Sequence, residues 1–150
     1  MSDDTVYVRL DKEITGKKLP YYNMNPRKEI KDAMSRNDWV GGFSIAVSYF
    51  ELFGFHTLIR YCNSLGKPLS KTVKDELKRT NVKQLVVLLF SLRLINRDTY
   101  SKMNKTIKER NKLIHFLRGG PDYRDRKQED RAKELLQDAI ECIYSFVESD

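Results

Sequence analysis

The sequence predicts an all-α domain, a bundle of four to five helices preceded by a short extended N-terminal arm. Three observations lead to this prediction. Apolar residues recur at intervals of three and four residues over most of the chain after residue 25. Asn, Asp, Ser, Gly and Pro, which favour helix ends, separate these periodic segments. The alternating pattern of a strand occurs only near the start of the chain.

The chain divides into an arm, residues 1–24, and a helical domain, residues 25–150. The arm contains the alternating stretch TVYVRL, then Gly16, Pro20 and the polar turn NMNP. A length of 150 residues with 40% hydrophobic content suits one core, so we expect no second domain.

The first two helices are predicted from their caps. Asn25 followed by Pro26 favours a helix that begins there and ends near Asn37. Asp38 can cap a long second helix that runs to about Leu65. Apolar residues occupy several sides of this helix, which is typical of a central helix packed all round. They are Trp39, Phe43, Ile45, Val47, Phe50, Leu52, Phe55, Leu58, Tyr61 and Leu65.

The later helices follow a break at GKPLS. Ser70 is expected to cap a short basic helix, and Asn81 to begin the apolar segment NVKQLVVLLFSLRLI. Asp98 is expected to cap a fifth helix, which Gly119, Gly120 and Pro121 would end. The last helix spans about 125–148, with the inward residues Ala132, Leu135, Ala139, Ile143 and Phe146.

Positive charge is concentrated in one part of the chain. The formal net charge is +7, yet the segment from Arg60 to Arg118 alone holds 15 basic and 4 acidic residues. Such a segment favours a polyanionic partner through counterion release. Solvated lysines on helix surfaces give similar counts in proteins that bind no polyanion.

Cysteine usage and hydropathy indicate a cytoplasmic protein with no membrane segment. Cys62 and Cys142 stand far apart, without a CxxC pair or clustered histidines, so we expect no disulfide, metal site or cofactor. The N-terminus lacks the basic and apolar regions of a signal peptide. The longest apolar run, LVVLLF, is too short to span a bilayer.

The segment RNKLIHF, residues 110–116, is the candidate chemical site. Arg110 falls within the expected core stripe of its helix, formed by Met103, Ile107, Ile114 and Leu117, where a charge is costly unless it is paired. Asn104, Asn111 and His115 form a polar ridge beside that stripe. Arg110 and His115 would point roughly 140° apart around the helix axis, so a second copy of the helix is one way to bring both to one phosphate.

An arginine and a histidine suit phosphodiester chemistry without a metal. The arginine can neutralise charge that builds on a phosphate, and the histidine can move a proton at a ribose hydroxyl or a leaving oxygen. The negative end of the helix favours the protonated imidazole of His115. The alternative is a half-exposed helix end that carries two cations for modest stability.

The sequence ERNKLIH on a late helix of an all-α domain resembles the HEPN superfamily, whose signature is Arg, four to six residues, then His, with a polar residue after the Arg. Arg110, Asn111 and His115 match this signature. The resemblance covers residues 26–148, because the segment SIAVSYFELFGFHTLI is similar to the family's early helix, with Glu51 at a position that is often acidic.

This resemblance implies a homodimer whose two signatures line one cleft, and a metal-independent endoribonuclease. Arg110 would stabilise the scissile phosphate, His115 would be the general acid or base, and Asn111 would position them. Glu51 would orient the arginine, or would simply be a surface acid. The family also implies a toxin or antiphage defence role, with an antitoxin or nucleotidyltransferase-like protein as partner.

Other side chains around the signature are candidates for RNA contacts. Lys108, Lys112 and Arg118 would bind neighbouring phosphates, or would be ordinary solvated charges. Tyr100 and Tyr123 can stack on bases, although aromatic residues near helix ends more often pack. Two other functions stay open, which are a non-catalytic RNA- or nucleotide-binding or scaffold module and a structural helical partner of another protein.

Overall fold

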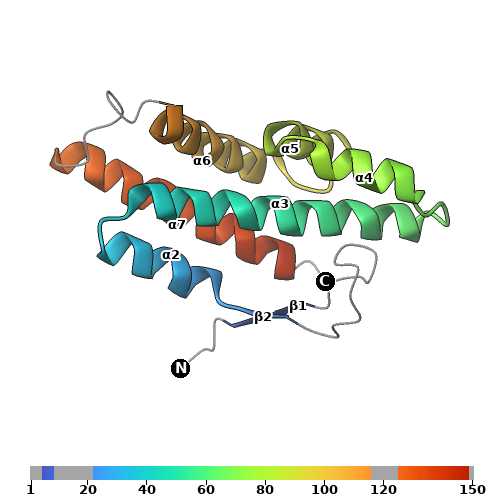
Figure 1. Ribbon diagram of the computed structural model, residues 1–150, viewed down its shortest axis with the longest axis horizontal. Coiled ribbons are helices and arrows are strands. Elements are labelled where there is room, and N and C mark those ends of the chain that lie inside the picture. The colour runs from blue at the N-terminus through green and yellow to red at the C-terminus, as the bar shows by residue number, and fades with distance from the viewer. Residues whose placement is uncertain (1–4, 9–21, 116–124, 149–150) are drawn as a thin grey trace.

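The computed structural model describes residues 5–8, 22–115 and 125–148 as a helical bundle with a small two-stranded sheet on one side (Figure 1). The predicted all-α bundle is confirmed. Its helices are α2 (Pro26–Ser35), α3 (Trp39–Ser64), α4 (Lys71–Arg79), α5 (Val82–Ser91), α6 (Arg97–His115) and α7 (Arg126–Glu148). Its strands are β1 (Val6–Val8) and β2 (Tyr22–Met24).

The described residues of the predicted arm form two paired strands and not a single extended segment. β1 and β2 pair in antiparallel fashion, with Val6 opposite Met24. Val6 is 3% exposed and belongs to the same hydrophobic core as the helices. The alternating pattern near the N-terminus therefore marks a strand that packs against the bundle.

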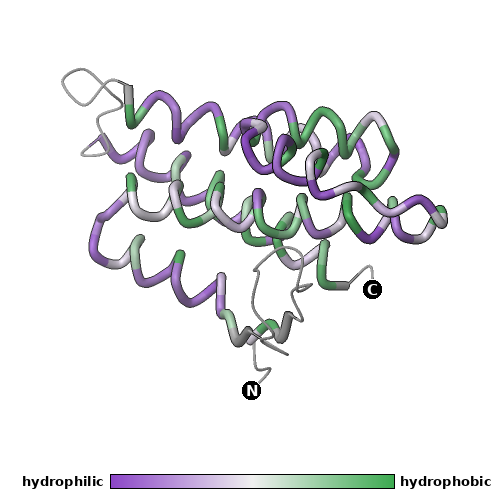
Figure 2. Tube along the Cα trace, turned by 45° about the vertical axis from the view of Figure 1, so that its right-hand side comes forward, coloured by the Kyte–Doolittle hydropathy of each residue, from purple (hydrophilic) through white to green (hydrophobic). Residues whose placement is uncertain are grey.

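α3 is the central helix, as its apolar residues on several sides predict. It packs against α2, α5, α6 and α7, and apolar residues follow its whole length (Figure 2). α3 is also the one helix in the described ranges that is long and apolar enough to cross a membrane. Because 56% of its apolar window is buried in the bundle, packing in a protein core accounts for this apolar character.

Side-chain caps begin the first four helices where the sequence predicts them. Asn25, Asp38, Ser70 and Asn81 each accept a hydrogen bond from the backbone N–H three residues ahead. The acceptor distances range from 2.8 Å at Asn81 to 3.3 Å at Ser70. Each cap satisfies a backbone donor that the helix itself leaves without a partner.

The cap predicted for α6 is wrong by two residues. Asn96, and not Asp98, accepts the hydrogen bond from the backbone N–H of Thr99, at 2.8 Å. Asp98 lies in the first turn and forms an ion pair with Lys102 at 3.1 Å. α5 also ends earlier than predicted, at Ser91, because Arg93 adopts a left-handed backbone conformation with φ 59°.

We expect Asn96→Ala to lower the free energy of unfolding by about 1 kcal/mol, because α6 loses its N-cap. Asp98→Ala is the matched control two residues away, and it should cost less because Asp98 contributes an exposed ion pair. Urea unfolding monitored by circular dichroism compares the two. An equal or larger effect of Asp98→Ala would contradict the assignment of the cap.

α7 packs against α2, α3 and α6 through the inward stripe predicted for it. Ala132, Leu135, Ala139 and Ile143 are buried, whereas Phe146 is half-buried and packs beside Phe53. Further buried residues of α7 are Leu136, Ile140 and Cys142. The stripe is therefore wider than the sequence predicts, because α7 packs against several helices.

The two cysteines are free thiols with different surroundings, since Cys142 is buried and Cys62 is half-buried. Burial raises the pKa of the Cys142 thiol to about 12. We expect iodoacetamide at pH 8 to alkylate Cys62 first and Cys142 only after unfolding in urea, because the thiolate is the nucleophile. Mass spectrometry of the labelled peptides measures this. Labelling of Cys142 in the native protein at the rate of Cys62 would contradict the expected protection.

Candidate functional site

The candidate site lies on the last turns of α6, which packs against α3, α5 and α7. Arg110 is half-buried there. Its Nε–H donates a hydrogen bond to the side-chain oxygen of Asn111, at 3.0 Å. This contact fixes the orientation of the guanidinium plane. Among the described residues, no partner is seen for the Nη groups, which leaves donors that suit a phosphate.

The core stripe of α6 differs from the predicted one near the site. Met103 and Ile107 are buried as predicted, but Ile114 is 44% exposed. The buried positions beyond Ile107 are Glu109 and Leu113. The buried face turns toward α7 in the last turns of α6, so Arg110 and Ile114 are left at its edge.

Glu109 is the buried charge of this helix, and the sequence analysis missed it. Its side chain is 2% exposed and accepts a hydrogen bond from Nη2 of Arg131 in α7, at 2.8 Å. Arg131 itself is 51% exposed. A carboxylate removed from water requires such a partner, so this pair fastens the turn that carries Arg110 to α7.

His115 is the last residue of α6, and the structure describes its backbone position only. α6 is helical from Arg97 to His115, so the backbone of the whole signature interval is regular. Arg118 and Tyr123, together with Gly119, Gly120 and Pro121, lie outside the described residues. The composite site formed by two copies therefore stays a prediction.

Lys108 and Lys112 are exposed on the side of α6 that borders α7. With Lys105 they line a hollow of about 400 Å³ between the two helices. The hollow also contains the carboxylates of Glu134 and Asp138 together with the Glu109–Arg131 pair. Burial raises the pKa of Asp138. Because positive and negative side chains both line the hollow, its outer edge suits a phosphate better than its floor.

Glu51 is exposed and lines a different hollow, of about 340 Å³, with residues of α4 and α5. Lys78 and Thr80 lie on its other side, and no residue of α6 lines it. The predicted role of Glu51 in orienting Arg110 remains a prediction. No cluster of three His, Cys, Asp or Glu side chains that could hold a metal ion occurs in the described ranges.

No protein-family model, curated protein or solved structure matches this chain. The likeness to the HEPN superfamily therefore depends on the signature Arg110, Asn111 and His115 within a helical bundle.

Proposed function

We propose that the protein is a metal-independent endoribonuclease of the HEPN type, which acts as a homodimer on single-stranded RNA. The observation that supports this function most directly is the Arg110–Asn111 hydrogen bond. It orients a half-buried guanidinium at the first position of the signature, as phosphate binding requires. The basic segment from Arg60 to Arg118 adds general attraction for RNA.

In this proposal the 2′-hydroxyl of the RNA attacks the adjacent phosphorus, and the bond from phosphorus to the 5′ oxygen breaks. Arg110 donates hydrogen bonds to the non-bridging oxygens, which gain charge in the transition state. His115 of one subunit takes the proton of the hydroxyl, and His115 of the partner subunit protonates the leaving oxygen. The products are a 2′,3′-cyclic phosphate and a free 5′ hydroxyl.

The cellular role and the partner that we propose follow from the same resemblance. The protein works in the cytoplasm as a toxin or antiphage defence component, and an antitoxin or nucleotidyltransferase-like protein controls it. Lys108 and Lys112 contact phosphates that flank the scissile one, because both are exposed at the edge of the α6–α7 hollow.

The second candidate function is a non-catalytic RNA-binding module. The basic segment favours it, because most of its 15 basic residues lie outside the signature and attract a polyanion without any chemistry. Such a module would bind RNA in a salt-sensitive manner and would lose affinity gradually as lysines are removed.

Incubation with single-stranded RNA in excess EDTA tests the leading proposal. We expect cleavage of RNA, no cleavage of DNA of the same sequence, and cyclic phosphate ends in the products. His115→Ala should slow the reaction by about 10²- to 10⁴-fold, the usual contribution of a general acid or base. RNA binding without cleavage would favour the non-catalytic module, and cleavage that needs a divalent metal would reject the proposed mechanism.

A further inference from the structure

A second feature lies at the junction of α5 and α6, away from the signature. Val82, Leu85, Val86 and Leu89 bury one side of α5, but Phe90 keeps 36% of its surface exposed. The Phe90 ring stacks on the ring of Tyr100 in α6, with centroids 4.5 Å apart and planes at 19°. Part of the Phe90 ring is therefore open to solvent, where an aromatic partner can stack on it.

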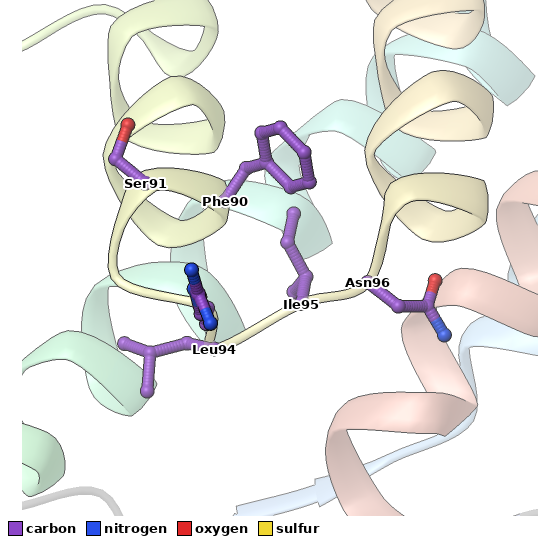
Figure 3. A pocket seen from close by; sticks show the side chains of 6 residues that line it. Phe90, Ser91, Leu94, Ile95 and Asn96 are labelled. Atoms are coloured by element: carbon purple, nitrogen blue, oxygen red, sulfur yellow. The ribbon is translucent and has the colours of Figure 1, made fainter.

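The Phe90 ring borders a hollow of about 600 Å³ at this junction, which is large enough for a nucleotide. In Figure 3 the ring projects between the two helices and lies over Ile95. The hollow thus has an apolar floor and an aromatic wall. Its lining residues are Phe90, Ser91, Arg93, Leu94, Ile95 and Asn96.

Polar groups at the rim of this hollow suit a nucleotide. Arg93 is exposed, and a tight turn places it there, closed by the hydrogen bond from its N–H to the carbonyl of Phe90 at 2.9 Å. The oxygen of the Asn96 side chain caps α6, so its NH₂ group is turned to donate elsewhere. A cation near an aromatic ring is a combination that binds a phosphate and a neighbouring base.

The hollow and the signature lie along one side of α6. Tyr100 and Asn111 are eleven residues apart on this straight helix, so they share a face and lie about 16 Å apart along its axis. A single RNA strand laid along this face reaches both places a few nucleotides apart. Both places belong to the segment from Arg60 to Arg118, which is basic overall and attracts a polyanion.

We infer that Phe90 is a stacking platform for a nucleobase of single-stranded RNA, a few nucleotides from the phosphate bound at Arg110. The placement of that phosphate rests on the proposed function. Phe90 stacks on one base, Arg93 pairs with the phosphate next to it, and Tyr100 supports the ring from behind. Stacking tolerates any base, so this site selects single strands over duplexes and has no strong sequence preference.

Binding of a fluorescent octanucleotide with 2′-O-methyl riboses tests the platform separately from catalysis, because this probe has no attacking hydroxyl. We expect Phe90→Leu to weaken binding by about 5- to 150-fold, the range for loss of one aromatic stack, and Phe90→Tyr to bind as the unchanged protein does. Leu65→Ala removes another exposed apolar side chain and should change nothing. Thermal unfolding checks that each variant is folded.

The binding of two further ligands distinguishes base stacking from the effects of charge and of distance. Inorganic polyphosphate has no bases, so Phe90→Leu should leave its binding unchanged whereas Arg93→Ala weakens it. Tyr100, on which Phe90 stacks, lies about 16 Å along α6 from Asn111, so we expect a dinucleotide bound at Arg110 to bind Phe90→Leu and the unchanged protein with the same affinity. Equal losses for polyphosphate and RNA in Phe90→Leu would overturn the inference.

The remaining outcomes are also decisive. An octanucleotide that binds Phe90→Leu as tightly as the unchanged protein would reject the platform, even if RNA is cleaved. Binding that depends on Phe90 in a protein that cleaves no RNA would keep the platform and reject the endoribonuclease. A shift from dimer to monomer in Phe90→Leu during size-exclusion chromatography would assign this ring to a second protein copy and overturn the inference.

Discussion

Arg110→Ala is expected to lower the rate of RNA cleavage by about 10²- to 10³-fold, the usual loss for one preorganised donor to transition-state charge. The guanidinium is half-buried and oriented by Asn111, so it loses little freedom when it binds a phosphate. Arg110→Lys should lose part of this activity, because lysine keeps the charge and cannot offer two parallel donors. Single-turnover cleavage in EDTA measures both variants.

Arg36→Ala is the matched control for this experiment. Arg36 is exposed at the end of α2, outside the basic segment, so its removal changes the net charge by the same amount. We expect its cleavage rate to match that of the unchanged protein. Thermal unfolding of Arg110→Ala should stay close to normal because the side chain is half-exposed. A cleavage rate of Arg110→Ala equal to that of Arg36→Ala would contradict the proposed role of Arg110.

Arg131→Ala is expected to destabilise the bundle by about 1 to 3 kcal/mol, because it removes a charge-assisted hydrogen bond to the buried Glu109 carboxylate. The reverse change, Glu109→Gln, should cost less. Glutamine keeps the shape and an acceptor, and Arg131 is half in water already. A domain of this size has only about 5 to 15 kcal/mol of stability, so the first variant loses a large part of it.

Lys133→Ala provides the control on the same helix. Lys133 forms an exposed ion pair with Glu129 at 3.1 Å, one turn away, and exposed pairs of this kind contribute about 0.3 to 0.5 kcal/mol. Urea unfolding of the three variants ranks them directly. If Arg131→Ala unfolds at the same urea concentration as Lys133→Ala, the buried pair does not fasten α6 to α7.

The helices were predictable because local chemistry marks their ends. A short polar residue precedes each of four predicted helices, and its usual role at that position is to cap the helix. These residues are Asn25, Asp38, Ser70 and Asn81. The N-cap of α6 was predicted wrongly because the same local signal occurs twice there. Asn96 and Asp98 are both good caps, and sequence does not show which one the turn after α5 brings into place. In the structure the chain leaves α5 through the left-handed residue Arg93, and Asn96 is the residue that caps α6.

The site was less predictable because burial depends on tertiary packing. Spacing along one helix placed Arg110 in the core stripe, but the stripe turns where α7 begins to cover α6, so Glu109 is buried instead. A partner such as Arg131, 22 residues away, leaves no periodic trace in the sequence. The Arg110–Asn111 contact lies between sequence neighbours, and the resemblance to the HEPN superfamily implied a positioning role for Asn111 without specifying this hydrogen bond.

The Glu109–Arg131 pair makes the packing of the candidate site depend on a residue that is translated after α6. Residue 131 leaves the ribosome after the whole of α6, so a nascent chain that already exposes residues 97–115 lacks both Arg131 as a partner for Glu109 and the α7 surface that covers α6. α6, which carries the signature, therefore cannot complete its packing until α7 has been translated. Under the proposed ribonuclease function, we therefore expect a ribosome-bound fragment that ends before residue 131 not to cleave the messenger RNA that encodes it.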